Sequence, residues 1–146
     1  MEFKKILIPV DGSDPSMNAF HCALDLAKAH KTEMILLYVI DANEMFYATN
    51  QVMLSGEFFE TMKGVGTKLI EKLVSEIPED VPHKSICVVG IPGETASDIA
   101  KSEEVDLIVM GNSGKGAFNA FVTGSVSQYV IHHVIHHVEC PVLIVK

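Results

Sequence analysis

The chain has 146 residues, of which 48% are hydrophobic and 21% charged, a composition that predicts one folded domain over residues 1–146. Its net charge of −8 disfavours nucleic acid as a partner, because such binding requires a basic surface. No signal-peptide pattern opens the sequence and no apolar run approaches the roughly 18 residues of a membrane span, so we expect a cytoplasmic protein with no membrane partner.

The first predicted elements are a buried strand and a helix. Ile6–Val10 (ILIPV) is a continuous apolar run, which is typical of a strand buried on both faces. The segment DGSDPS then predicts a turn and a helix start, with Ser13 or Asp14 as the N-cap and Pro15 at the first helical position. The helix continues through Met17–His30, where apolar residues recur at helical spacing.

A second strand and a longer helix follow. Met34–Ile40 (MILLYVI) predicts another buried strand, and residues 41–55 are ambiguous, with loop and some helix expected. Phe58–Ile77 is amphipathic and predicts a helix, although Gly64 and Gly66 weaken it. The loop after the second strand is rich in large apolar side chains, which suit either core packing, a dimer contact or a lid.

The second half of the chain repeats the alternation of strand and helix. It predicts, in chain order, strand Ser85–Val89, helix Glu94–Ser102, strand Leu107–Met110, helix Ser125–Val138 and strand Val142–Val145. The three cysteines, Cys22, Cys87 and Cys140, form no CxxC pair, and we expect buried, reduced thiols.

The alternation predicts an α/β fold with an open, five-stranded parallel sheet covered by helices on both faces. Right-handed crossovers favour the strand order 3-2-1-4-5, as in Rossmann-like folds. Ligands of such sheets bind at the carboxyl ends of the strands, where the winding direction switches. Here that point lies between the first and fourth strands, next to Asp11 and the glycine-rich segment 110–128.

The glycine-rich segment has the spacing G-x2-G-x9-G-S at Gly111, Gly114, Gly124 and Ser125. Glycine permits positive φ and close approach of a ligand to the backbone, and free amides at the start of the predicted helix form an anion site. Backbone amides suit phosphate binding by an acidic protein, and Lys115 is the one cation of the segment. The alternative is a tight turn followed by a capped helix, with no ligand.

The chain resembles the universal stress protein family over its whole length. The resemblance rests on KKILIPVDGS, LLYVID, VVGIPGE, DLIVMGNSGKG, TGSVS and CPVLIVK, and the glycine spacing is that of the ATP-binding branch of the family. It implies bound ATP, with Mg²⁺ or Mn²⁺ held mainly through the phosphates. It also implies a homodimer in which the last strand pairs antiparallel with its twin, which would cover the apolar edge formed by Val142, Leu143, Ile144 and Val145.

The resemblance also implies a set of nucleotide-binding residues. Pro9, Val10 and Asp11 would line the adenine and ribose, Val39 would meet the adenine edge through its backbone, and the glycine motif would hold ribose and phosphates. From the residues alone, Asp11 suits a ligand contact or a helix-start cap equally. The full implied set is Pro9, Val10, Asp11, Val39, Met110, Gly111, Asn112, Gly114, Lys115, Gly116, Gly124, Ser125, Val126 and Ser127.

The tetrapeptide VIHH occurs twice in residues 130–138. The spacing from GSV to the closing CPV is therefore about four residues longer than is usual in the family. The i, i+4 pairs His132/His136 and His133/His137 would share a helix face and suit zinc or nickel. The alternative is a duplication at an exposed helix end, where histidine also suits the helix dipole. We expect no metal held by the protein alone.

The sequence favours an ATP-binding regulatory protein of the stress response over an enzyme. Phosphoryl transfer needs a placed metal, a group that orients the nucleophile and cations for the developing charge, and only Lys115 is a candidate cation in the loop. The alternatives are a weak ATPase or phosphotransferase, and a protein-binding module that holds no nucleotide.

Overall fold

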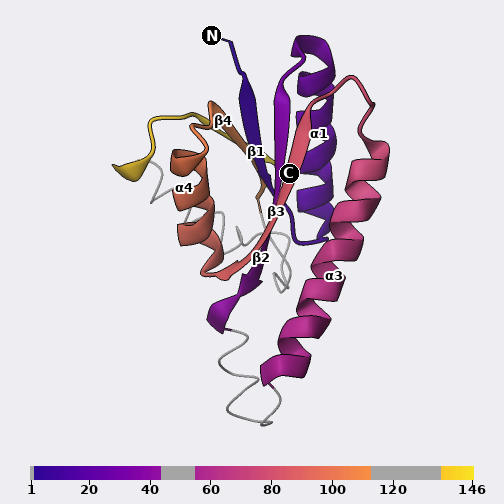
Figure 1. Ribbon diagram of the computed structural model, residues 1–146. Helices are drawn as coiled ribbons and strands as arrows, with labels where there is room; N and C mark the ends of the chain where they lie inside the picture. Colours follow the sequence, from indigo (N-terminus) through magenta and orange to yellow (C-terminus); the bar gives the residue numbers. More distant parts are fainter. Residues whose placement is uncertain (1, 44–54, 113–135) are drawn as a thin grey trace.

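The structure is a computed structural model that describes residues 2–43, 55–112 and 136–146 (Figure 1). Within these ranges the strands and long helices are, in chain order, β1 (Lys5–Pro9), α1 (Asp14–His30), β2 (Glu33–Asp41), α3 (Ser55–Glu76), β3 (His83–Gly90), α4 (Pro92–Ser102), β4 (Leu107–Gly111) and β5 (Val142–Val145). No helix in the described ranges is long and apolar enough to cross a membrane.

The strands form one parallel sheet in the order β3-β2-β1-β4-β5, which confirms the expected topology. The helices α1 and α3 lie on one side of the sheet, and α4 lies on the other (Figure 1). Because successive strand residues point to opposite faces, Ile6 and Ile8 pack with Phe20 of α1, while Leu7 packs with Ala96 of α4. The strand β1 is therefore buried on both faces, as its unbroken apolar run indicated.

Strand and helix ends agree with expectation to within three residues, and β5 has the expected bounds. The largest difference is in α3, which begins at Ser55 and not at Phe58, while β3 and α4 each begin two residues early, at His83 and Pro92. Along β3 exposed and half-buried residues alternate, because this strand lies at the edge of the sheet. The ambiguous segment 41–55 lies largely outside the described residues, but Ala42 and Asn43 are helical.

Helix α3 runs without a break through Gly64 and Gly66. A Cβ on Gly66 would lie 2.4 Å from Cδ1 of Tyr38, so the aromatic ring of β2 occupies the space that a side chain at residue 66 would need. Gly64 faces open space, and a Cβ there would meet no atom within 4 Å. The helix-weakening glycine at position 66 is therefore required by packing against the sheet, whereas the one at position 64 is not.

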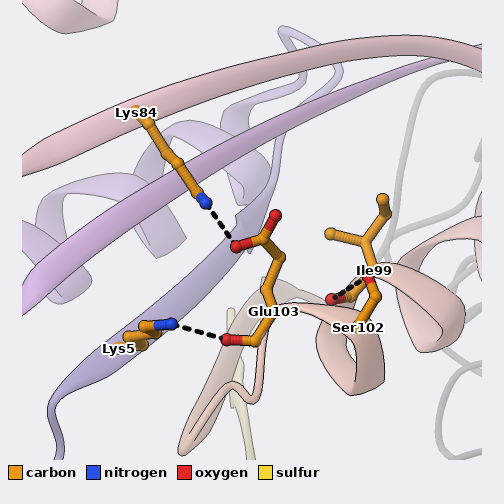
Figure 2. Close-up of polar contacts among 5 residues, drawn as sticks. All are labelled: Lys5, Lys84, Ile99, Ser102 and Glu103. Atoms are coloured by element: carbon orange, nitrogen blue, oxygen red, sulfur yellow. Dashed lines mark hydrogen bonds and ion pairs between the residues drawn. The ribbon is translucent and has the colours of Figure 1, made fainter.

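The amino ends of two strands are fastened to the end of α4 (Figure 2). The ammonium of Lys5 donates to the backbone oxygen of Glu103 over 2.8 Å, and the ammonium of Lys84 forms an ion pair with the Glu103 carboxylate. A cation at the carboxyl end of a helix is favoured by the helix dipole. In the next turn of chain, the Asp106 carboxylate accepts from the backbone N–H groups of Lys4 and Lys5 over 2.9 and 2.8 Å.

The expectation of three buried thiols is wrong for Cys87, which is exposed on β3, while Cys22 and Cys140 are half-buried. The reason is the edge position of β3, which leaves alternate side chains uncovered. Partial burial still raises the pKa of the Cys87 thiol above its ordinary value, and the ammonium of Lys63 on α3 lowers the pKa in part.

Replacing Lys63 with methionine is expected to slow alkylation of Cys87 by iodoacetamide near pH 8 by about twofold. The ammonium stabilises the thiolate, so its loss raises the thiol pKa further and leaves less of the nucleophilic form. Mass spectrometry of the Cys87 peptide against time measures the rate. Cys140 in the same sample is the control, because the charge near its thiol is Asp106; an unchanged Cys87 rate, relative to Cys140, would contradict the prediction.

Candidate functional site

The candidate site begins where β1 leaves the sheet. Pro9 is the last residue of β1 and is half-buried, and Val10 after it is buried. The N–H of Val10 donates to the carbonyl of Leu37 over 2.9 Å, which extends the ladder with β2 by one more bond. The chain is therefore held firmly up to the residue before Asp11.

Asp11 is held by a hydrogen-bond network at the start of α1. Its Oδ1 atom accepts from the backbone N–H of Ser13 over 2.9 Å and from the Ser13 hydroxyl over 2.5 Å. Ser13 is the N-cap of α1, so Asp11 braces the cap residue and is not the cap itself. Pro15 stands at the second helical position, because α1 begins at Asp14.

Ser16 completes this network, and the sequence reading missed it. It is buried, its hydroxyl donates to the carbonyl of Ser13 over 3.0 Å, and it accepts from the N–H of Asp11 over 3.3 Å. The i, i+3 spacing of Ser13 and Ser16 is the signal that could have found it, since side chains three residues apart meet at a helix start. The half-buried Asp11 carboxylate is thereby fixed in orientation before any ligand arrives.

Gly111, the first glycine of the motif, is the last residue of β4 and is buried. A Cβ at this position would lie 2.7 Å from the carbonyl carbon of Pro15 and 2.9 Å from its oxygen. Gly111 therefore lets the end of β4 and the start of α1 touch, which brings the β4 end close to the Asp11 network. The expected positive φ is found elsewhere: among the described glycines it occurs at Gly12, with φ 84°.

Three further residues of the implied set lie in the described ranges. Val39 of β2 is half-buried on the α4 side of the sheet, and Met110 of β4 is buried in the same core. The N–H of Asn112 donates to the carbonyl of Val145 over 2.9 Å, so the start of the glycine-rich segment is bonded to the end of β5. The Met110 side chain packs in the hydrophobic core, whereas Asn112 connects the candidate site to the edge strand.

The sequence model of the universal stress protein family matches residues 2–146. The chain belongs to the universal stress protein family. Among its relatives, universal stress protein MJ0531 of Methanocaldococcus jannaschii is 32% identical over 99% of this chain and 82% of that protein. The solved structure of hypothetical protein MJ0577 from the same organism is similar, with a TM-score of 0.84 and 34% identity over 100% of this chain and 97% of that one.

More distant universal stress proteins share the fold of this family member. One, solved in complex with cAMP, has a TM-score of 0.67 and 20% identity over 100% of this chain and 98% of that chain. Another, At3g01520 of Arabidopsis thaliana, was solved with AMP bound and has a TM-score of 0.63 and 21% identity over 99% of this chain and 91% of that chain.

The rest of the implied nucleotide site of this universal stress protein lies outside the described residues. This holds for Gly114, Lys115, Gly116, Gly124, Ser125, Val126 and Ser127. It holds for His132 and His133 of the repeated VIHH as well, whereas His136 and His137 are helical and exposed. Within the described part of the chain, no group of three or more histidine, cysteine or acidic side chains is arranged to hold a metal ion.

Proposed function

We propose that this protein binds ATP at the carboxyl edge of the sheet between β1 and β4, with Asp11 on the ribose side and the phosphates on the glycine motif. The observation that carries the proposal is the meeting of two chain segments at the switch point: Gly111 touches Pro15, and the same turn of chain holds Asp11 through Ser13 and Ser16. Parallel sheets of this order bind ligands at that point.

The comparisons support an adenine nucleotide as the ligand class. Two family members of the same fold were solved with cAMP and with AMP, and both ligands contain adenine, ribose and phosphate. The choice of ATP rests on the glycine spacing, which offers two groups of backbone amides to a polyphosphate. Mg²⁺ or Mn²⁺ would be bound through phosphate oxygens, since such ions usually keep few protein ligands.

We further propose that the protein acts as a nucleotide-dependent switch and as a homodimer through Val142–Val145. The strand β5 lies at the edge of the described sheet, and Leu143 on it is 38% exposed. The hydrogen bond from Asn112 to Val145 joins this edge to the first residues of the glycine motif. A nucleotide that binds one arrangement of the motif more tightly would therefore bias the edge strand as well.

The first test is chemical identification of the bound ligand. We expect protein purified without added nucleotide, then denatured, to release ATP that anion-exchange chromatography separates from AMP and ADP. Release of no nucleotide, together with no heat of binding when ATP is titrated into the protein, would contradict the proposed site and favour a protein-binding module.

The switch is tested separately by sedimentation of the dimer with and without Mg-ATP. We expect nucleotide to change the dimer dissociation constant several-fold, because Asn112, next to the first glycine of the motif, is hydrogen-bonded to Val145 of the edge strand. If ATP binds but the dissociation constant does not change, the nucleotide site stands and the switch does not. Linear, protein-dependent ADP production would instead indicate an ATPase.

A further inference from the structure

A groove of about 660 Å³ lies at the opposite edge of the sheet, where the strands begin. Its walls come from three chain segments: the residues before β1, the end of α4 with the turn into β4, and the residues before β5. The apolar part of its lining includes Phe3, Val105, Val138 and Pro141. The volume falls in the range of about 300–1,000 Å³ that is usual for small-molecule sites.

The charged side chains of this groove are mostly acidic. Glu2, Glu104, Asp106 and Glu139 line it, against the basic side chains of Lys101 and His137. The Asp106 carboxylate is engaged by two backbone N–H groups. In the described part of the chain the other three carboxylates make no hydrogen bond or ion pair, so they are open to a cationic ligand.

Glu104 stands where a helix end usually has glycine. Its φ is 53°, its N–H donates to Lys101 over 3.2 Å, and the N–H of Val105 donates to Ala100 over 2.9 Å. This pair of bonds is the Schellman motif, in which the left-handed residue is most often glycine because a Cβ is disfavoured there. The chain therefore places a carboxylate in this groove in a conformation that glycine would adopt with less strain.

We propose that this groove is a second ligand site, distinct from the nucleotide site, and that it binds a linear aliphatic polyamine. Three exposed, open carboxylates from three chain segments line the groove together with apolar side chains, and a polyamine likewise combines ammonium groups with methylene chains. The excess of carboxylates disfavours anions. A single metal ion is disfavoured because the described residues contain no suitable group of three ligands.

The probe is spermidine, titrated calorimetrically at an ionic strength of about 0.1 M, where charges are screened beyond about 10 Å. We expect saturable binding of one spermidine per chain and no binding of a neutral diol of the same length. Glu104→Gly should weaken binding by about 2- to 5-fold, and Lys101→Gln should strengthen it by a similar factor, as for single exposed ion pairs.

The matched control for both variants is Lys31→Gly. Lys31 ends α1 with φ 54°, so it has the same backbone conformation as Glu104, but it does not line the groove. Glu104→Gly and Lys31→Gly should both melt at or above the wild-type temperature, because glycine suits these positions. A loss of spermidine binding in Glu104→Gly then reports the carboxylate and not misfolding.

Three outcomes would overturn the proposal. Equal strengthening by Lys31→Gly and Lys101→Gln would mean that spermidine senses only the net charge of the protein. If Glu104→Gly binds spermidine as tightly as the wild type does, the groove is not the spermidine site. Absence of saturable spermidine binding, together with an oligolysine peptide that binds the wild type and binds Glu104→Gly more weakly, would identify the groove as a contact for a basic protein.

Discussion

Replacing Gly114 with valine is expected to abolish the stabilisation that Mg-ATP gives to the wild-type protein. A ligand present at about 100 times its dissociation constant adds roughly 2.7 kcal/mol to the free energy of unfolding, and this gain requires binding. Gly114 is the second glycine of the G-x2-G-x9-G-S spacing, and a branched side chain there would block the approach of phosphate to the backbone amides. Thermal unfolding with and without Mg-ATP measures the effect.

The Gly114→Val variant without nucleotide should unfold at close to the wild-type temperature, which separates loss of a ligand from loss of the fold. Gly64→Ala is the matched control. A Cβ at Gly64 meets no atom, so this variant should gain about 1 kcal/mol of stability from helix propensity and keep its full response to ATP. A Gly114→Val protein that ATP stabilises as strongly as wild type would show that the glycine motif is only a turn.

Replacing Gly111 with alanine is expected to lower the free energy of unfolding by about 1–3 kcal/mol even without nucleotide. The added Cβ would lie 2.7 Å from the carbonyl carbon of Pro15, a backbone atom that the first turn of α1 holds in place. The backbone must therefore shift, either at the end of β4 or at the start of the helix. Urea unfolding, read by circular dichroism, measures the change.

The two glycine variants are thus expected to differ in their stability with and without ATP. Gly111→Ala should lose stability with and without ATP, and Gly114→Val should lose only the response to ATP. If Gly111→Ala is as stable as wild type, the contact with Pro15 is looser than the structure has it. In that case the first glycine would serve the ligand directly, as the sequence motif alone suggested.

The strand order and the identity of every described strand could be predicted because each strand is a short, mainly apolar run between turn residues. The sequence narrowed the N-cap of α1 to Ser13 or Asp14, since capping depends on the local chain, and the structure has Ser13 in that position. The edge position of β3 also followed from the predicted order, but its effect on Cys87 did not. Exposure depends on how far α3 covers the edge strand, and no local pattern encodes that.

By itself the sequence determined the alternation of strands and helices, the family and the glycine spacing, because these depend on residues that are close along the chain. Only the tertiary structure decided why Gly111 and Gly66 are glycines, since their neighbours Pro15 and Tyr38 are distant in sequence. The tertiary structure also forms the groove at the amino edge of the sheet. Three segments between residues 2 and 141 form that groove, and only the parallel packing of β1, β4 and β5 brings their ends together.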